Sequence, residues 1–115
     1  MVNNELPLDR SFAALAHPLR RAIVERLGTG PASVGEATRG FPVSKPAISR
    51  HLRVLEDAGV VVRAIEGRTH RLRLAHAPLD GASEWIERQR ALWERKFDVV
   101  EEYLGEQAND RLEEQ

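Results

Sequence analysis

Apolar residues recur every three or four positions in four segments of the first half of the chain, which is the period of an amphipathic helix. The pattern predicts helices over about residues 9–16, 18–27, 34–40 and 45–58. Pro18 and Pro46 suit the first turn of a helix, because the amide N–H that proline lacks would have no helical partner there. Ser33, followed three residues later by Glu36, and Ser44 are the predicted N-caps of the third and fourth helices.

The second half of the chain changes period. Residues 60–65 favour a strand, residues 66–68 a turn, and residues 69–74 alternate, with Thr69, Arg71 and Arg73 on one face. A long helix is predicted over about residues 79–104. The predicted order is α-α-α-α-β-β-α, a mostly helical fold with a small β-hairpin. The third and fourth helices then form a helix-turn-helix, and the hairpin forms a wing.

These elements divide the chain into functional segments. Residues 1–7 are expected to be an N-terminal arm, residues 8–77 a winged helix-turn-helix domain, residues 78–104 a dimerisation helix and residues 105–115 a polar tail. A length of 115 residues fits one folded domain. The absence of cysteine excludes disulfides and thiolate metal sites. Neither a secretory signal nor an apolar run of about 18 residues is found, so the expected location is the cytoplasm, away from membranes.

The formal net charge of −1 hides an uneven distribution. Residues 44–74 carry seven lysines and arginines against three acidic residues, whereas residues 101–115 carry six acidic residues and one arginine. A basic segment centred on the fourth helix and the hairpin is typical of a nucleic-acid-binding surface. The expected partner is double-stranded DNA.

Two separated motifs carry a family resemblance. The first is Phe12-Ala13-Ala14-Leu15-Ala16-His17-Pro18-Leu19-Arg20-Arg21, and the second runs from Pro42 to Val61 and contains His51-Leu52-Arg53-Val54-Leu55 followed by Ala58-Gly59. In this order they resemble the ArsR-type winged-helix repressors, and the resemblance covers residues 8–104. It implies a homodimeric transcriptional repressor that binds an inverted-repeat operator.

The fourth helix is the predicted recognition helix. Ile48, Leu52 and Leu55 point inward at about 100° per residue, which leaves the basic positions outside. Arg50 is placed to contact guanine, and the wing arginines to contact the DNA backbone or minor groove. The predicted DNA-binding residues are Ser44, Lys45, Pro46, Ser49, Arg50, His51, Arg53, Arg68 and Arg71.

Structural roles remain open for several of these residues and their neighbours. Ser44 is expected to cap its helix, and His51 borders the buried face, where a structural hydrogen bond is as well founded as a DNA contact. Arg53 has Asp57 within reach as an ion-pair partner. The side chains of Arg63 and Arg73 are expected to solvate the wing, and those of Arg20 and Arg21 to form intramolecular ion pairs.

The last helix carries more large apolar residues than a small domain can cover along its length. Self-association through this helix and the first one is the simplest explanation. The predicted dimerisation residues are Phe12, Leu15, Trp85, Ile86, Trp93, Phe97, Val100 and Leu104. A ligand pocket built on Trp85 and Trp93 is the alternative.

Other functions have weaker support in the sequence. ArsR-type metal sensors use cysteines or a set that includes histidine on the last helix, and this chain has neither, so no metal or other cofactor is expected. Asp98, Glu101 and Glu102 would suit Ca²⁺ or Mg²⁺ better than Zn²⁺. No catalytic motif points to an enzyme. A winged-helix module that binds protein, an unknown small-molecule or protein inducer, and activation instead of repression remain open.

Overall fold

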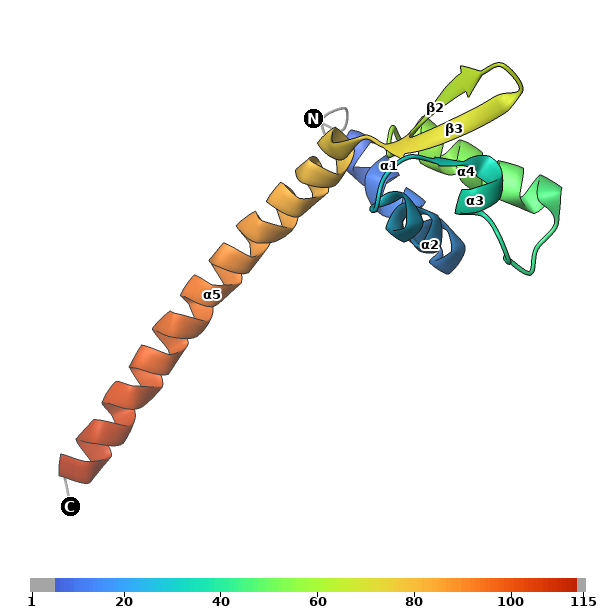
Figure 1. Cartoon of the computed structure of the whole chain (residues 1–115). Helices are drawn as coiled ribbons and strands as arrows, with labels where there is room; N and C mark the ends of the chain where they lie inside the picture. Colours follow the sequence, from blue (N-terminus) through green and yellow to red (C-terminus); the bar gives the residue numbers. More distant parts are fainter. Residues whose placement is uncertain (1–5, 114–115) are drawn as a thin grey trace. The chain divides into compact units, whose positions relative to one another are not determined.

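A computed structural model describes residues 6–113 of the chain, with side chains for residues 7–107 (Figure 1). The chain divides into two compact units, Met1–Ala82 and Ser83–Gln115. The predicted N-terminal arm falls mostly on residues 1–5, which lie outside the described residues. Within the described residues, the sheet and the first four helices belong to the first unit.

Four helices build most of the first unit: α1 (Leu6–Ala14), α2 (Pro18–Leu27), α3 (Val34–Ala37) and α4 (Lys45–Asp57). The predicted caps are confirmed, since the side chains of Ser33 and Ser44 accept hydrogen bonds from the amides of Glu36 and Ala47. His17 is a further N-cap, because its Nδ1 accepts from the amide of Leu19. Histidine is an uncommon cap, and the sequence pattern did not predict this role.

The predicted hairpin is present as β2 (Val61–Glu66) and β3 (Thr69–Leu74), which pair antiparallel with Val61 opposite Leu74. The expected alternation is confirmed, with Leu72 buried and Thr69, Arg71 and Arg73 exposed. A third strand, β1 (Ala32–Ser33), pairs with β3 and gives the order β1-β3-β2. Two residues are too short a segment to produce an alternating pattern, so the sequence did not predict β1.

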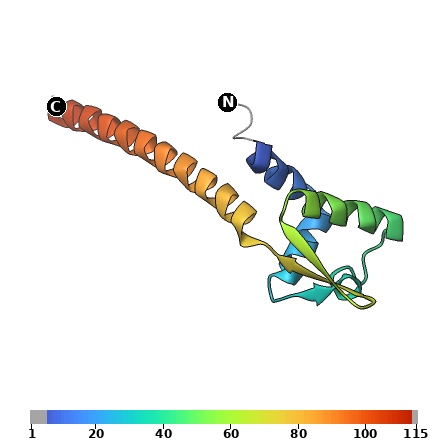
Figure 2. The same cartoon turned by 90° about the horizontal axis from the view of Figure 1, so that it is seen from above.

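The core of the first unit joins the helices to the sheet. Ile23 and Leu27 from α2, Leu52 and Leu55 from α4, and Leu72 from β3 are buried in one cluster. Figure 2 shows α1 beside the C-terminal end of α4. This packing holds the inner face of α4 and leaves its outer face uncovered within the described residues.

Helix α1 differs from its prediction at both ends and in its buried face. It begins at Leu6 and ends at Ala14, whereas residues 9–16 were predicted. Its buried residues are Ser11 and Ala14, while Phe12 and Leu15 are only partly buried. Burial of Ser11 is compensated because its hydroxyl donates to the carbonyl of Pro7 at 3.0 Å.

Helix α5 (His76–Glu113) is longer at both ends than the predicted 79–104. Pro78 is accommodated in the first turn, where a proline breaks no helical hydrogen bond. Residues 105–113 continue the helix beyond its predicted end at residue 104. Most of these residues are good helix formers, whereas the prediction ended the helix where the apolar positions became sparse.

Leu55→Ala is expected to lower the free energy of unfolding by about 2–5 kcal/mol, because Leu55 is fully buried and its truncation leaves a cavity. Val54→Ala is the matched control on the same helix, where Val54 is 38% exposed, and should cost about 0.5 kcal/mol or less. Urea unfolding at one fixed protein concentration measures both changes. Equal losses would contradict the placement of the core.

Candidate nucleic-acid interface

The outer face of α4 carries the predicted base-reading residues. Leu52 and Leu55 are buried, while Lys45, Pro46, Ser49, Arg50 and Arg53 are exposed. Among the described residues, Lys45, Arg50 and Arg53 have no hydrogen-bond or ion-pair partner, and the pairing of Arg53 with Asp57 does not form. The structure therefore brings three uncompensated cations together on one side of this helix.

The turn that leads into α4 is fixed by an arginine that the sequence prediction did not assign. Arg26 donates from Nη1 to the carbonyls of Ala37 (3.1 Å) and Arg39 (2.8 Å). Its guanidinium also lies 4.2 Å from the ring centroid of Phe41. These contacts join α2 to the connection between α3 and α4, which are the two helices of the helix-turn-helix.

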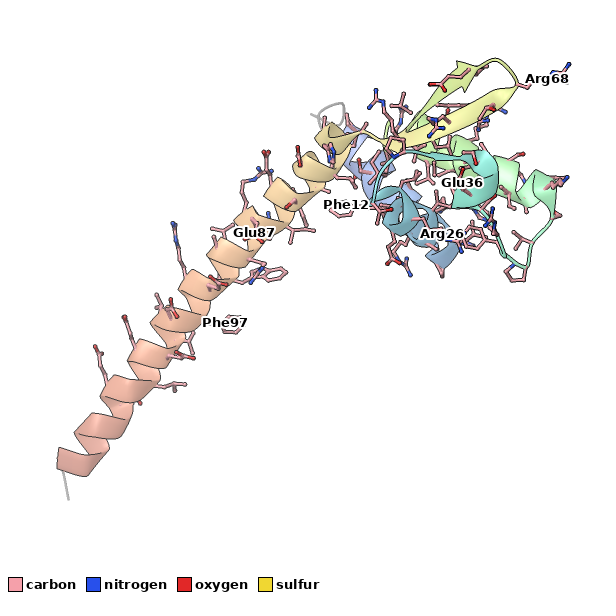
Figure 3. The ribbon with its side chains drawn as sticks, in the orientation of Figure 1. Phe12, Arg26, Glu36, Arg68, Glu87 and Phe97 are labelled. Carbon is pink, nitrogen blue, oxygen red and sulfur yellow. The ribbon has the colours of Figure 1, made fainter. Side chains whose placement is uncertain are left out.

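The wing presents further cations. Gly67 has a φ of 63°, a left-handed conformation that favours glycine and allows the tight turn between β2 and β3. Arg68 follows it at the tip of the wing and is exposed (Figure 3). Arg73 is exposed as well, while Arg71 lies 3.7 Å from Glu66 in an exposed ion pair. Such a pair contributes little and is easily exchanged for another anion.

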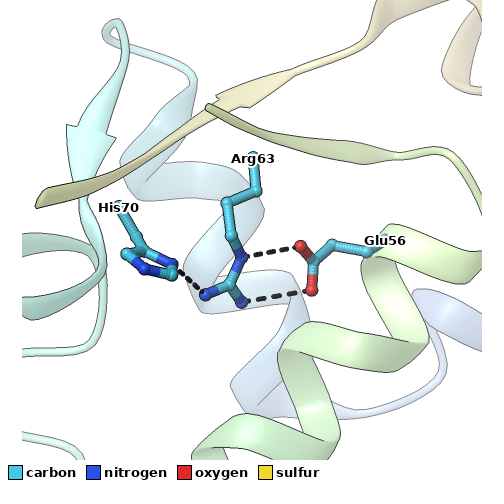
Figure 4. A network of polar contacts seen from close by, with 3 residues as sticks. All are labelled: Glu56, Arg63 and His70. Atoms are coloured by element: carbon cyan, nitrogen blue, oxygen red, sulfur yellow. Dashed lines mark hydrogen bonds and ion pairs between the residues drawn. The ribbon is translucent and has the colours of Figure 1, made fainter. Parts of the chain in front are cut away.

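Arg63 links the recognition helix to both strands of the wing (Figure 4). Its Nε and Nη2 donate to the two carboxylate oxygens of Glu56 at 2.8 and 3.2 Å, and its Nη1 contacts Nδ1 of His70 at 3.0 Å. Arg63 and Glu56 are each 27% exposed in their side chains. The expectation that Arg63 only solvates the wing is therefore wrong, and the seven-residue separation between Arg63 and Glu56 gave no local signal for the pair.

His51 is held by residues from α2. Nη1 of Arg20 contacts Nδ1 of His51 at 3.0 Å, and the rings of His17 and His51 have centroids 4.3 Å apart. Arginine only donates, so Nδ1 of His51 accepts and the ring is neutral with its proton on Nε2. Of the two roles considered for His51, the structure shows the structural hydrogen bond.

Arg20 and Arg21 bond intramolecularly, although not to carboxylates as predicted. Arg20 donates to the carbonyls of Ala14 (2.7 Å) and Ala13 (3.0 Å), and Arg21 donates to the carbonyl of Leu15 (2.8 Å). The last carbonyls of a helix lack helical partners, and cationic side chains satisfy them well. These arginines therefore secure the end of α1 and the segment that follows it.

The pKa of His51 is lowered from its ordinary value of 6.5. Burial is the main cause, followed by the positive charges of His17, Arg20 and Arg50. The neutral ring is therefore the form that fits this site, in agreement with the hydrogen bond that it accepts from Arg20.

The second unit exposes the predicted dimerisation residues of α5. Trp85 is 38% exposed, Trp93 57% and Phe97 66%. Ile86, Trp93 and Val100 are spaced seven residues apart, and Phe97 and Leu104 each follow one of them by four. Positions with these spacings share one face of a helix, so these five side chains form a continuous apolar stripe.

Two other kinds of feature are absent from the part of the chain that the structure describes. No helix there is long and apolar enough to cross a membrane. No three histidine, aspartate or glutamate side chains come together there in a group that could hold a metal ion.

Known proteins have sequences related to the helix-turn-helix region of this chain. A family model described as a helix-turn-helix domain matches residues 15–64, from before α2 into β2. The HTH-type transcriptional regulator Rv2034 of Mycobacterium tuberculosis is 58% identical over 53 residues, which is 46% of this chain and half of that protein. The transcriptional repressor SdpR of Bacillus subtilis is 30% identical over 69% of this chain and 88% of that protein.

Solved structures extend the likeness to the fold. The crystal structure of an ArsR family transcriptional regulator, RHA00566, has a TM-score of 0.73 and 35% identity, covering 76% of this chain and 97% of that chain. The homodimeric winged helix-turn-helix DNA-binding domain Mb0332 from Mycobacterium bovis has a TM-score of 0.54 and 25% identity. The match covers 80% of this chain and 79% of the Mb0332 chain.

The fold and its relatives define the class of protein. This is a winged helix-turn-helix protein of the transcriptional-regulator type. Its relatives are named as transcriptional regulators and not as enzymes, which agrees with the prediction made for this chain from its sequence. The chain belongs to the ArsR family, and the relatives support a DNA-binding transcriptional repressor.

Acidification is expected to destabilise the protein through His51. A folded pKa below 6.5 means that the unfolded chain binds the proton more tightly, so this contribution to stability is complete above pH 6.5 and is lost as the pH falls through the lowered pKa. Urea unfolding at about pH 7.5 and 5.5 measures the loss. His51→Gln should reduce it and His76→Gln, at an exposed position, should not. An unchanged loss in His51→Gln would contradict the assignment.

Proposed function

We propose that the protein is a repressor that binds an inverted repeat in double-stranded DNA as a homodimer. The observation that carries the proposal is the set of cations on the outer face of α4 and on the wing that are exposed and lack strong partners among the described residues. A protein-binding surface would be expected to show apolar or acidic residues at these positions. The family provides the class of activity, and this surface supports DNA as the partner.

The proposed recognition begins at the first turns of α4. A helix fits the major groove and its N-terminal residues reach the base edges. Arg50 would make a bidentate contact with guanine, worth about 1–3 kcal/mol of discrimination. Lys45 and Arg53 would contact phosphates, with Ser49 and the first turn formed by Ser44 and Pro46 beside them.

The wing would add contacts to the backbone or minor groove from Arg68 and Arg71. Arg71 would exchange its exposed ion pair with Glu66 for a phosphate. His51 takes a different part in this proposal, because its Nδ1 already accepts from Arg20. It would hold α4 against α2, so that the neighbouring Arg50 is presented at a fixed angle.

The homodimer would form through the apolar stripe of α5, and Trp85 of α5 and Phe12 and Leu15 of α1 would also contribute to the interface. Large apolar side chains that are more than half exposed are unfavourable in water, and a second copy provides the same surface to cover them. Two recognition helices related by a two-fold axis would then reach half-sites about 34–36 Å apart. A compact dimer bound at a promoter blocks transcription by occupying the site.

The proposed setting is the cytoplasm, where such a regulator meets the chromosome. A small molecule or a protein would act as the inducer. No metal or other cofactor is part of the proposal.

Arg50→Ala is expected to remove preference for one base pair in each half-site, because the contact with guanine is lost. Selection of bound duplexes from a randomised pool compares it with the wild type and with Arg88→Ala, which removes an exposed arginine from α5. Arg88→Ala should select the wild-type motif. If Arg50→Ala selects the wild-type motif with the same base preference at every position, Arg50 does not recognise a base.

Phe97→Glu is expected to dissociate the dimer, because it places a charge in the apolar stripe that the second copy covers. Val99→Glu is the matched control, since two residues along a helix is about 200° around it and places Val99 on the opposite face. Sedimentation velocity measures the oligomeric state of both. If the dimer persists in Phe97→Glu but dissociates in Val99→Glu, the interface lies on the face of Val99, and the proposal is contradicted.

A further inference from the structure

An open pocket of about 400 Å³ lies between the start of α3 and the wing, within the first unit. Its lining includes Arg63 from β2, Arg68 from the turn, Thr69 and His70 from β3, and Ser33 beside α3. None of the described residues that line it is acidic. Two guanidinium groups therefore border a space whose lining residues include no carboxylate, although Glu36 accepts from the hydroxyl of Ser33 and Glu56 pairs with Arg63.

Arg63 retains donors that its structural contacts do not use. A guanidinium has five N–H groups, and the contacts with Glu56 and His70 use one each on Nε, Nη1 and Nη2. One N–H on each of Nη1 and Nη2 remains without a partner among the described residues. The bidentate contact with Glu56 also holds the plane of the guanidinium, which lowers the entropic cost of binding a further group.

His70 adds a donor of the same kind. Nδ1 of His70 faces an N–H of Arg63, which can only donate, so the tautomer that fits this contact presents Nε2 as a donor. Nε2 has no partner among the described residues. Arg68 is exposed and has no partner among the described residues, and Thr69 provides a hydroxyl. A wall rich in donors and poor in acceptors complements a phosphate group.

We infer that this pocket binds one backbone phosphate of the DNA duplex, with Arg63 as the contacting group. The inference rests on the proposed function and adds a site to it. Arg68 belongs to both the pocket and the cationic wing, so the pocket is continuous with the proposed DNA surface. The pocket is open, which suits a phosphate that remains attached to a polymer. Glu56 has the role of a positioning residue that orients Arg63.

The test compares Arg63→Gln with Glu56→Gln in the full-length protein. Both substitutions break the same ion pair, but only the first removes the cation that would contact phosphate. Affinity for a mixed-sequence duplex is measured by fluorescence anisotropy over a range of salt. Each phosphate contact contributes about 0.9 to the slope of log affinity against log salt.

Arg63→Gln should therefore lower the slope by about 0.9, so that between 50 and 200 mM salt the wild type loses about 3.5-fold more affinity than the variant. Glu56→Gln should keep the wild-type slope, and Arg63→Lys should restore it because it restores the charge. An unchanged slope in Arg63→Gln, or an equal reduction in Glu56→Gln, would overturn the inference. Thermal unfolding of each variant sets a temperature at which all are folded.

Inorganic phosphate distinguishes the source of the bound group. In an NMR titration without DNA, the inference predicts no saturable shift of the His70 resonances at submillimolar phosphate. Saturation there would assign the pocket to a free anion and overturn the assignment to DNA. If the wild type fails to bind the duplex, both the proposed function and this inference are contradicted. If the wild type binds and Arg63→Gln leaves the slope unchanged, only the assignment of the pocket as a phosphate site is contradicted.

Discussion

Burial of Leu52 and Leu55 against α2 and the sheet is the constraint on which the rest of this structure depends. A helix has one orientation in which both leucines face the core, and that orientation presents Lys45, Arg50 and Arg53 outward. The turn held by Arg26 and the cap at Ser44 set where the helix begins. The proposed base-reading face is therefore a consequence of core packing, and a change in the core would rotate or loosen it.

The arginines of the first unit divide into two groups with different physical roles. One group bonds within the fold: Arg20 and Arg21 to backbone carbonyls, Arg26 to carbonyls and an aromatic ring, and Arg63 to a carboxylate. The other arginines are exposed and lack strong partners among the described residues; most of them lie on α4 and the wing, whereas Arg10 lies on α1 and Arg39 between α3 and α4. A net charge close to zero is compatible with DNA binding because the charges are unevenly distributed along the chain: residues 44–74 carry seven cations against three acidic residues, whereas residues 101–115 carry six acidic residues. Arg63 would connect the two groups, since its structural ion pair leaves donors for a ligand.

Sequence reasoning succeeded where the signal was local. The bounds of α2, the caps at Ser33 and Ser44, and the two faces of the hairpin followed from periodicity and capping residues a few positions apart. It failed where partners are far apart in the chain or the segment is very short. Arg20 meets His51 across 31 residues, and β1 has only two residues. The length of α5 was underestimated because its last turns lack the apolar spacing that marked the rest.

Selection of genomic DNA fragments by the purified full-length protein, at physiological salt and with a chelator present, tests the central claim most directly. The proposal predicts enrichment of a short inverted repeat whose half-sites are about one helical turn apart. Enrichment of no sequence, or binding that disappears at moderate salt for all fragments alike, would contradict a sequence-specific repressor and favour a module that binds protein.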